Sequence, residues 1–407
     1  MAAVHAAVFA PTIVNALFRP ALVHPSLWVW HAARIPETFR VPWRPVQVHF
    51  GWAATSRALD AVLPTSDPRV AGAIVSLVAA AGFGVSLWHV LRRQLDGSEL
   101  SGPLAALGLS LLVALLEAPA AVQGWQHIAE PLHSWVPLYF PFVPTTLASM
   151  GLNVALVWMA VRLLRGDLEA RWRPWLPVTV VAAAVAKPNL TPMLVVVVPA
   201  VAVAMDRRGW WSIGANDERW RDALRLVALP AAAITFLQLV VITKLSPPRL
   251  QGSVELHPLY ELRALGGFHW QYWLAALLPA LAVALLGRRV VDLPVAICLG
   301  SFALGLGATL LFARAGTTPD KGAVGGDILQ LAGTALAMTV IFTIRRLLVL
   351  RRAGELAGAA ALVLALALVP YLVAGASTWR CHSGLAHCYP ASIAGTWPPA
   401  EDHIDDP

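Results

Sequence analysis

Residues 69–91, with the sequence RVAGAIVSLVAAAGFGVSLWHVL, decide the fold class. This stretch contains no acidic residue, begins at Arg69 and is followed directly by Arg92 and Arg93. An α-helix rises about 1.5 Å per residue, so roughly 20 apolar residues cross the hydrocarbon core of a bilayer. The stretch is therefore predicted to form a transmembrane helix that ends at a pair of basic residues.

The composition of the whole chain agrees with this prediction. Of its 407 residues, 58% are hydrophobic and 13% are charged, and the mean hydropathy is +0.65. Soluble domains carry about 25% charged residues, so this composition excludes a soluble enzyme, a disordered regulator and a fibrous protein. The net charge of +7 does not indicate nucleic-acid binding, because the basic residues are spread over short connections. We expect an all-α fold, a polytopic transmembrane helix bundle.

About 10 or 11 spans are predicted on this criterion. The strong candidates are residues 69–91, 103–122, 143–164, 190–205, 224–243, 272–286, 293–312, 328–344 and 356–376. Residues 175–186 form a shorter apolar segment, and residues 2–23 form the weakest one, which either crosses the membrane or lies in the interface. The predicted transmembrane domain covers residues 1–376, and residues 377–407 form an extracytoplasmic tail.

The distribution of Lys and Arg orients the spans. Seventeen of the 30 basic residues lie in alternate short connections, at positions 92–93, 162–173, 207–225, 288–289 and 345–352, which we assign to the cytoplasm. The protein is then a multi-pass plasma-membrane protein with a cytoplasmic N-terminus and an extracytoplasmic C-terminus. Ten of the twelve His fall on the outer side, where the connections are also longer. Function is therefore expected on the outer face.

Residues 24–67 form a long first extracytoplasmic loop. Within it, residues 48–63 are predicted to form an amphipathic helix that lies on the bilayer, with Phe50, Ala54, Leu59 and Val62 on its apolar face.

Two carboxylates are candidate catalytic groups. Glu37 lies in the first outer loop among arginines and aromatic residues, where it could act as general base toward a sugar hydroxyl. Glu117 lies inside a span near its outer end, and an intramembrane carboxylate is costly unless it has a function or a partner. Two other acids have simpler expected roles, because Asp60 either faces solvent or pairs with Arg57, and Asp67 caps the next helix.

Residues 123–142 bring together His127, Glu130 and His133. Their spacing suits either a divalent cation or an acid/base pair, and the alternative is a re-entrant aromatic loop at the interface. A divalent cation is the one cofactor left open, and no metal ligand is assigned.

Several charged residues on the outer side suit an anionic group. Lys187 lies in a tight hairpin at the outer membrane surface, where it either binds a lipid phosphate or extends to the headgroups. Arg249 and Arg263 belong to the outer loop 244–271. Asp327 ends the flexible, Gly-rich loop 313–327, either as part of the site or as a helix cap.

Two cysteines lie in the outer tail. Cys381 and Cys388 are separated by a short Gly-containing loop, and an oxidising compartment permits a disulfide between them. The alternative is a metal site with the neighbouring histidines. Cys298, inside a span, is expected to be a small apolar packing residue.

The order of these features resembles the GT-C superfamily of polytopic glycosyltransferases. The matching pieces are the surface helix from His49-Phe50 onward, Pro144-Thr145-Thr146 at the start of a span, the Lys187-Pro188 hairpin, and Gly325-Gly326-Asp327 before a span. The resemblance covers residues 46–350. It implies transfer of a sugar from a polyprenyl-phosphate donor to a cell-envelope acceptor, with membrane lipids as further partners and no nucleic acid.

The same resemblance implies particular roles for residues. Lys187 would lie near the donor phosphate, and a catalytic Asp or Glu would lie in the first outer loop. No pair of adjacent acidic residues occurs in that loop, so either Glu37 takes the role, the start of the chain is incomplete, or the activity has been lost.

Two other functions compete with a glycosyltransferase. One is a transporter or flippase of envelope lipids, although no internal repeat of the kind that transporters show is evident. The other is a catalytically inactive GT-C-like membrane scaffold. A channel is disfavoured because no span carries a polar stripe.

Overall fold

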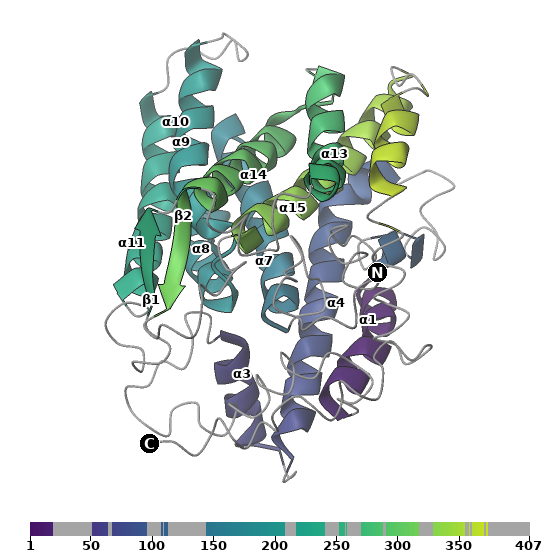
Figure 1. Cartoon of the computed structure of the whole chain (residues 1–407), viewed down its shortest axis with the longest axis vertical. Helices are drawn as coiled ribbons and strands as arrows, with labels where there is room; N and C mark the ends of the chain where they lie inside the picture. The colour runs from purple at the N-terminus through teal and green to yellow at the C-terminus, as the bar shows by residue number, and fades with distance from the viewer. Residues whose placement is uncertain are drawn as a thin grey trace.

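The computed structural model describes residues 1–18, 51–63, 67–95, 107–108, 110–112, 144–207, 217–240, 252–256, 258, 270–287, 290–316, 329–354, 358, 360–369 and 372. Within them the protein is a bundle of α-helices with one two-stranded antiparallel ribbon (Figure 1). The helical bundle confirms the predicted class. The ribbon was not predicted.

The elements follow in the order of the chain. The helices are α1 (Ala2–Phe18), α3 (Gly51–Asp60), α4 (Pro68–Leu95), α7 (Pro144–Arg165), α8 (Trp175–Ala186), α9 (Thr191–Arg207), α10 (Asp217–Ala223), α11 (Leu229–Val240), α13 (Trp270–Leu286), α14 (Leu293–Leu311) and α15 (Leu329–Arg352). A 3-10 turn, η3 (Ala170–Trp172), precedes α8, and a π-helical segment, η4 (Leu224–Ala228), joins α10 to α11. The strands are β1 (Gly252–Leu256) and β2 (Phe312–Gly316).

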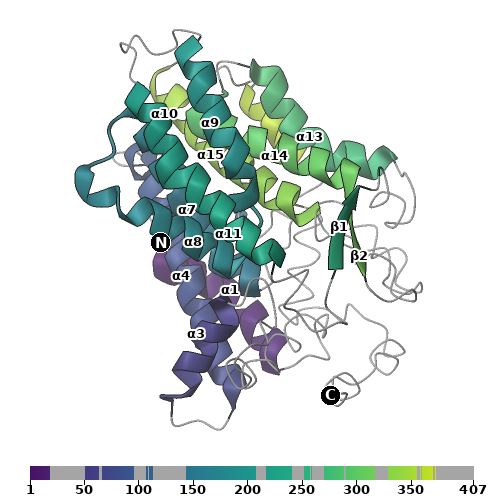
Figure 2. The ribbon, with the colours of Figure 1, turned by 90° about the vertical axis from the view of Figure 1, so that its left-hand side faces the viewer.

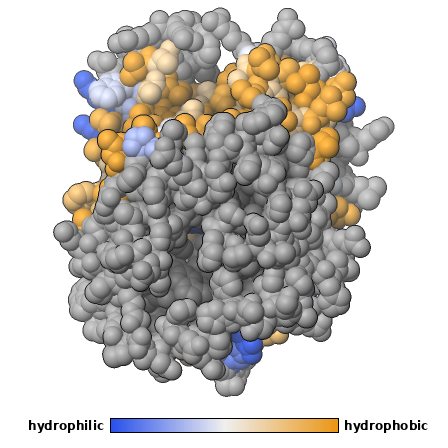
Figure 3. Space-filling view, viewed as in Figure 1, coloured by the Kyte–Doolittle hydropathy of each residue, from blue (hydrophilic) through white to orange (hydrophobic). Residues whose placement is uncertain are grey.

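Five of the described helical segments are long and apolar enough to cross a membrane. They are Pro68–Arg92, Leu147–Arg165, Arg219–Val240, Leu293–Leu311 and Leu331–Arg351. Each of them falls on a predicted span. The face seen in Figure 3 carries a broad area of exposed apolar side chains over the upper part of the bundle. These features support an integral membrane protein.

The first helix packs along α4 in the antiparallel direction. Near its start the ring of His5 lies 4.8 Å from that of Phe83, and at its end Arg69 lies over the ring of Phe18 at 5.4 Å. Phe9 and Ile13 between them are buried. The described part of residues 2–23 is therefore a helix packed on α4, and its two predicted placements, across the membrane or in the interface, stay predictions.

The start of α4 confirms the predicted helix cap. One carboxylate oxygen of Asp67 accepts a hydrogen bond from the backbone N–H of Arg69 at 2.9 Å, and the Arg69 guanidinium donates to both oxygens. These hydrogen bonds favour the ionised carboxylate and lower the pKa of Asp67 below its ordinary value of 3.8.

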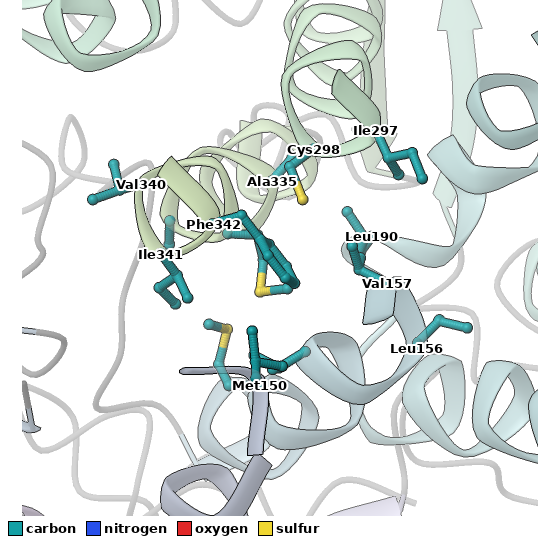
Figure 4. Packing of buried hydrophobic residues seen from close by; sticks show 14 of the residues in the cluster. Met150, Leu156, Val157, Leu190, Ile297, Cys298, Ala335, Val340, Ile341 and Phe342 are labelled. Carbon is teal, nitrogen blue, oxygen red and sulfur yellow. The ribbon is translucent and has the colours of Figure 1, made fainter. Parts of the chain in front are cut away.

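The core lies where α7, α14 and α15 meet the α8–α9 hairpin. Figure 4 shows five buried residues of one hydrophobic cluster: Met150 and Val157 of α7, Leu190 of the hairpin, Cys298 of α14 and Phe342 of α15. Cys298 is thus a buried packing residue in the interior of the bundle, as predicted.

Glycines allow the closest helix approaches in this core. A Cβ atom at Gly305 of α14 would lie 2.9 Å from the backbone nitrogen of Ala332 in α15. At Gly151 of α7 it would lie 3.0 Å from the backbone of Phe83 in α4. Small residues of this kind let helix backbones approach closely and gain dispersion energy in a membrane interior.

The two ends of the bundle differ in character. We call one the basic end, because α4 and α7 carry arginines in their last turns there and α15 carries them over its last two turns. We call the other the hairpin end, because the α8–α9 turn, α3 and the ribbon lie toward it, as Figure 2 also shows. Among the described residues, five of the arginines assigned to the cytoplasm from the sequence line one cavity at this end, as that assignment requires: Arg92, Arg162, Arg165, Arg171 and Arg345.

Candidate functional site

Of the predicted catalytic, binding and disulfide residues, the structure describes one, Lys187. The others lie outside the described residues: Glu37, Glu117, His127, Glu130, His133, Arg249, Arg263, Asp327, Cys381 and Cys388. The candidate site is therefore the α8–α9 hairpin, which carries Lys187.

The hairpin is a short extended turn between α8 and α9. The backbone N–H of Lys187 donates to the carbonyl oxygen of Ala183 at 2.9 Å, which closes α8. The N–H of Asn189 donates to the carbonyl oxygen of Lys187 at 2.8 Å. Pro188 between them has no N–H to continue a helix, so α8 stops and α9 begins at Thr191.

The Lys187 side chain is buried. Its exposed fraction is 5%, as is that of Asn189. The predicted alternative, a lysine that extends outward to the headgroups, does not describe a side chain enclosed by protein. The 12 residues of α8 rise only about 18 Å, less than the roughly 30 Å hydrocarbon core. The position of Lys187 at the membrane surface stays a prediction.

Polar side chains from two other helices meet the hairpin. Asn189 Nδ2 donates to Thr334 Oγ1 of α15 at 2.9 Å, and Gln238 Nε2 of α11 donates to the carbonyl oxygen of Ala184 at 2.8 Å. All three side chains are buried. The Oγ1 atom of Thr191 is also buried, without a hydrogen-bond partner among the described residues. We call Lys187, Asn189, Thr191, Gln238 and Thr334 the hairpin cluster.

Helix α3 closes the hairpin from the end of the bundle. A Cβ atom at Gly51 would lie 3.0 Å from the carbonyl oxygen of Val185, so the start of α3 rests on the last turn of α8. Trp52 Nε1 donates to Ser76 Oγ of α4 at 2.9 Å in a buried contact. The helix is therefore anchored to the bundle as well as to its neighbour in the chain.

A helix forms within the predicted residues 48–63, and Arg57 pairs with Asp60 at 2.8 Å, one of the two roles predicted for Asp60. Its buried residues are Trp52 and Ser56, and Trp52 contacts Ser76 of α4. Val62 of the predicted apolar face is 76% exposed, so the bundle does not cover it. Contact of that face with the bilayer stays a prediction.

The ribbon joins two predicted outer loops. Strand β1 comes from the loop 244–271 and β2 from the loop 313–327, with Val254 opposite Arg314 in antiparallel register. The start of the Gly-rich loop is thus a strand, not a flexible segment. The two loops that contain Arg249, Arg263 and Asp327 are held together at their described parts.

Helices α3 and α15 both contact the Lys187 hairpin. The motif Gly325-Gly326-Asp327, which precedes α15, lies outside the described residues. Pro144 is the first residue of α7, which packs on α8. Asn189, Gln238 and Thr334 were not predicted, although an amide or hydroxyl in an apolar span is a visible signal of a polar partner.

Within the described residues no group of three His, Cys, Asp or Glu side chains could hold a metal ion. The set His127, Glu130 and His133, predicted for a divalent cation, lies outside them. Comparison with models of known protein families finds no family that matches this chain, and comparison with curated proteins finds no similar sequence.

Proposed function

We propose that this protein is an integral membrane glycosyltransferase that moves a sugar from a polyprenyl-phosphate donor to a cell-envelope acceptor on the extracytoplasmic face. The observation that carries the proposal is the burial of Lys187 in the α8–α9 hairpin, which polar side chains of α11 and α15 also contact. Charged residues inside a membrane protein are costly, face the interior and mark substrate paths. A buried ammonium suits the phosphate of a lipid donor.

The proposed reaction breaks the bond between the anomeric carbon of the sugar and the donor phosphate oxygen. The electron pair leaves with the polyprenyl phosphate, whose negative charge Lys187 stabilises. The acceptor hydroxyl forms the new bond to the anomeric carbon and gives its proton to a carboxylate, for which Glu37 and Glu117 are the candidates.

Sugar transfer by the purified full-length protein in lipid nanodiscs tests this function. The donor is a radiolabelled polyprenyl-phosphate sugar, and the product is labelled envelope acceptor. We expect Lys187→Gln to lower transfer at least about a hundredfold, because a buried charge contact to the leaving group contributes several kcal/mol. Lys187→Arg, which keeps the charge, should retain part of the activity.

Arg57→Gln is the matched control, since it removes a positive charge from a partly exposed ion pair in α3. It should leave transfer unchanged. Movement of the donor across proteoliposomes without a new glycosidic bond would instead show a flippase. If the folded protein showed neither sugar transfer nor movement of the donor, the inactive scaffold would be the remaining function, and the proposal would be overturned.

A further inference from the structure

A cavity lies at the basic end, away from the hairpin cluster. Its volume is about 480 Å³, within the range of small-molecule sites. Helices α4, α7 and α15 contribute their last turns to its wall, and the segment between α7 and α8 completes it.

Five arginines line this cavity. They are Arg92 of α4, Arg162 and Arg165 of α7, Arg171 of η3 and Arg345 of α15. Two carboxylates, Asp167 and Glu169, lie in the same wall. A third, Asp292, is the partner of Arg345, so the described groups leave a net charge of +2 around the cavity.

Arg345 is fixed in place before any ligand binds. Its guanidinium donates to Asp292 Oδ2 at the start of α14 at 2.8 Å and lies over the Trp158 ring at 5.0 Å. Only 7% of the residue is exposed. A guanidinium held on two sides loses little conformational entropy when a ligand binds, which favours affinity.

The segment after α7 is held in a similar way. Gly166 has a φ of +76°, a backbone conformation that favours glycine, and a Cβ atom there would displace the Arg219 guanidinium, which would lie 2.6 Å away. Arg162 donates to the carbonyl oxygen of Asp167 at 2.7 Å across it. Farther along, Arg171 pairs with Glu169 at 2.8 Å. Two more arginines of the wall, Arg162 and Arg171, are therefore paired within this segment.

From this arrangement we infer that the cavity binds a phosphate-bearing anion, either the headgroup of an anionic lipid or a free phosphate compound. Guanidinium groups match phosphate oxygens with pairs of parallel hydrogen bonds, and several of them suit a group with more than one negative charge. Arginines at helix C-termini are also stabilised by the helix dipole. The helix dipole explains why arginines occur at the ends of these helices. It does not explain why several of them enclose a cavity with the buried Arg345 in its wall.

Binding to the full-length protein in neutral detergent tests this inference with two probes. Pyrophosphate is titrated by calorimetry at low ionic strength, and phosphatidylglycerol is added in mixed micelles with phosphatidylcholine while thermal stability is recorded. The double variant Arg92→Gln/Arg165→Gln should weaken the response about tenfold or more, because it removes charge-assisted hydrogen bonds to the anion. Arg92→Gln alone, at an exposed position, should give a smaller loss and leaves the fold intact.

Arg173→Gln is the matched control. Arg173 lies at the same end and pairs with Asp222 at 3.1 Å, but it does not line the cavity. If the cavity variants lose pyrophosphate binding but keep the phosphatidylglycerol response, the ligand is a soluble phosphate compound. If they lose only the phosphatidylglycerol response, the ligand is a lipid headgroup. No response to either probe, or an equal loss in Arg173→Gln, overturns the inference. The outcome is independent of sugar transfer, which depends on Lys187 at the hairpin end.

Discussion

Thr334 is the residue through which α15 holds the Lys187 hairpin. Its hydroxyl accepts the hydrogen bond from Asn189, and both side chains are buried. Thr334→Val would leave the Asn189 amide buried with one partner fewer, which costs about 1–3 kcal/mol. We expect a corresponding loss of stability in detergent unfolding, together with reduced sugar transfer.

Thr339→Val is the control for that prediction. Thr339 is also buried in α15, but its hydroxyl donates to the carbonyl oxygen of Ala335 in its own helix. Removing it leaves no other side chain unsatisfied, so the change in stability should be small. Equal losses from the two variants would contradict the structural role of the Asn189 contact.

Arg345 and Asp292 form an ion pair between α15 and the start of α14. The pair is nearly enclosed, with side-chain exposures of 9% and 14%. Arg345→Met would leave a buried carboxylate without its cation, which is expected to cost about 3–5 kcal/mol in unfolding free energy. The double variant Arg345→Met/Asp292→Asn removes both charges and should recover part of that loss. A double variant no more stable than the single one would contradict the ion pair's contribution.

Helix α14 contains a matched pair of glycines. A Cβ atom at Gly305 would lie 2.9 Å from the α15 backbone, whereas one at Gly307 meets nothing within 4 Å. Gly305→Ala should therefore push α14 and α15 apart and destabilise the bundle by about 1–3 kcal/mol. Gly307→Ala should be neutral or stabilise by up to about 1 kcal/mol, since alanine favours the helix. Unfolding in detergent measures both, and the reverse order would contradict the close packing.

Elements that depend on local sequence were the predictable ones. Residues 175–186 form a helix with the predicted bounds, because an apolar run ends at a proline. The ribbon depends instead on two short segments whose residues, such as Val254 and Arg314, pair over a long separation in the chain. The buried face of α3 likewise depends on Ser76 of α4. Neither partner is visible in a local hydrophobic pattern.

The whole molecule places its two polar regions toward opposite ends. The burial of Lys187 and the cavity around Arg345 both result from how helices meet, which spacing along the chain does not show. The sequence did indicate that the C-terminal ends of α4, α7 and α15 lie together, because the arginines at these ends belong to alternate connections. Their common side was predicted from the distribution of Lys and Arg, and the cavity that they enclose was not predicted.

The predicted orientation follows from that grouping and is tested by cysteine labelling. In a variant with Cys298, Cys381 and Cys388 replaced, Thr55→Cys reports on α3 and Ala170→Cys on η3; both positions are exposed. If the basic end is cytoplasmic, a membrane-impermeant maleimide should label position 55 in right-side-out vesicles. Position 170 should react only after the vesicles are opened, and both should react in detergent. The opposite pattern would place Lys187 on the cytoplasmic side, where a polyprenyl-phosphate sugar on the outer leaflet could not reach it.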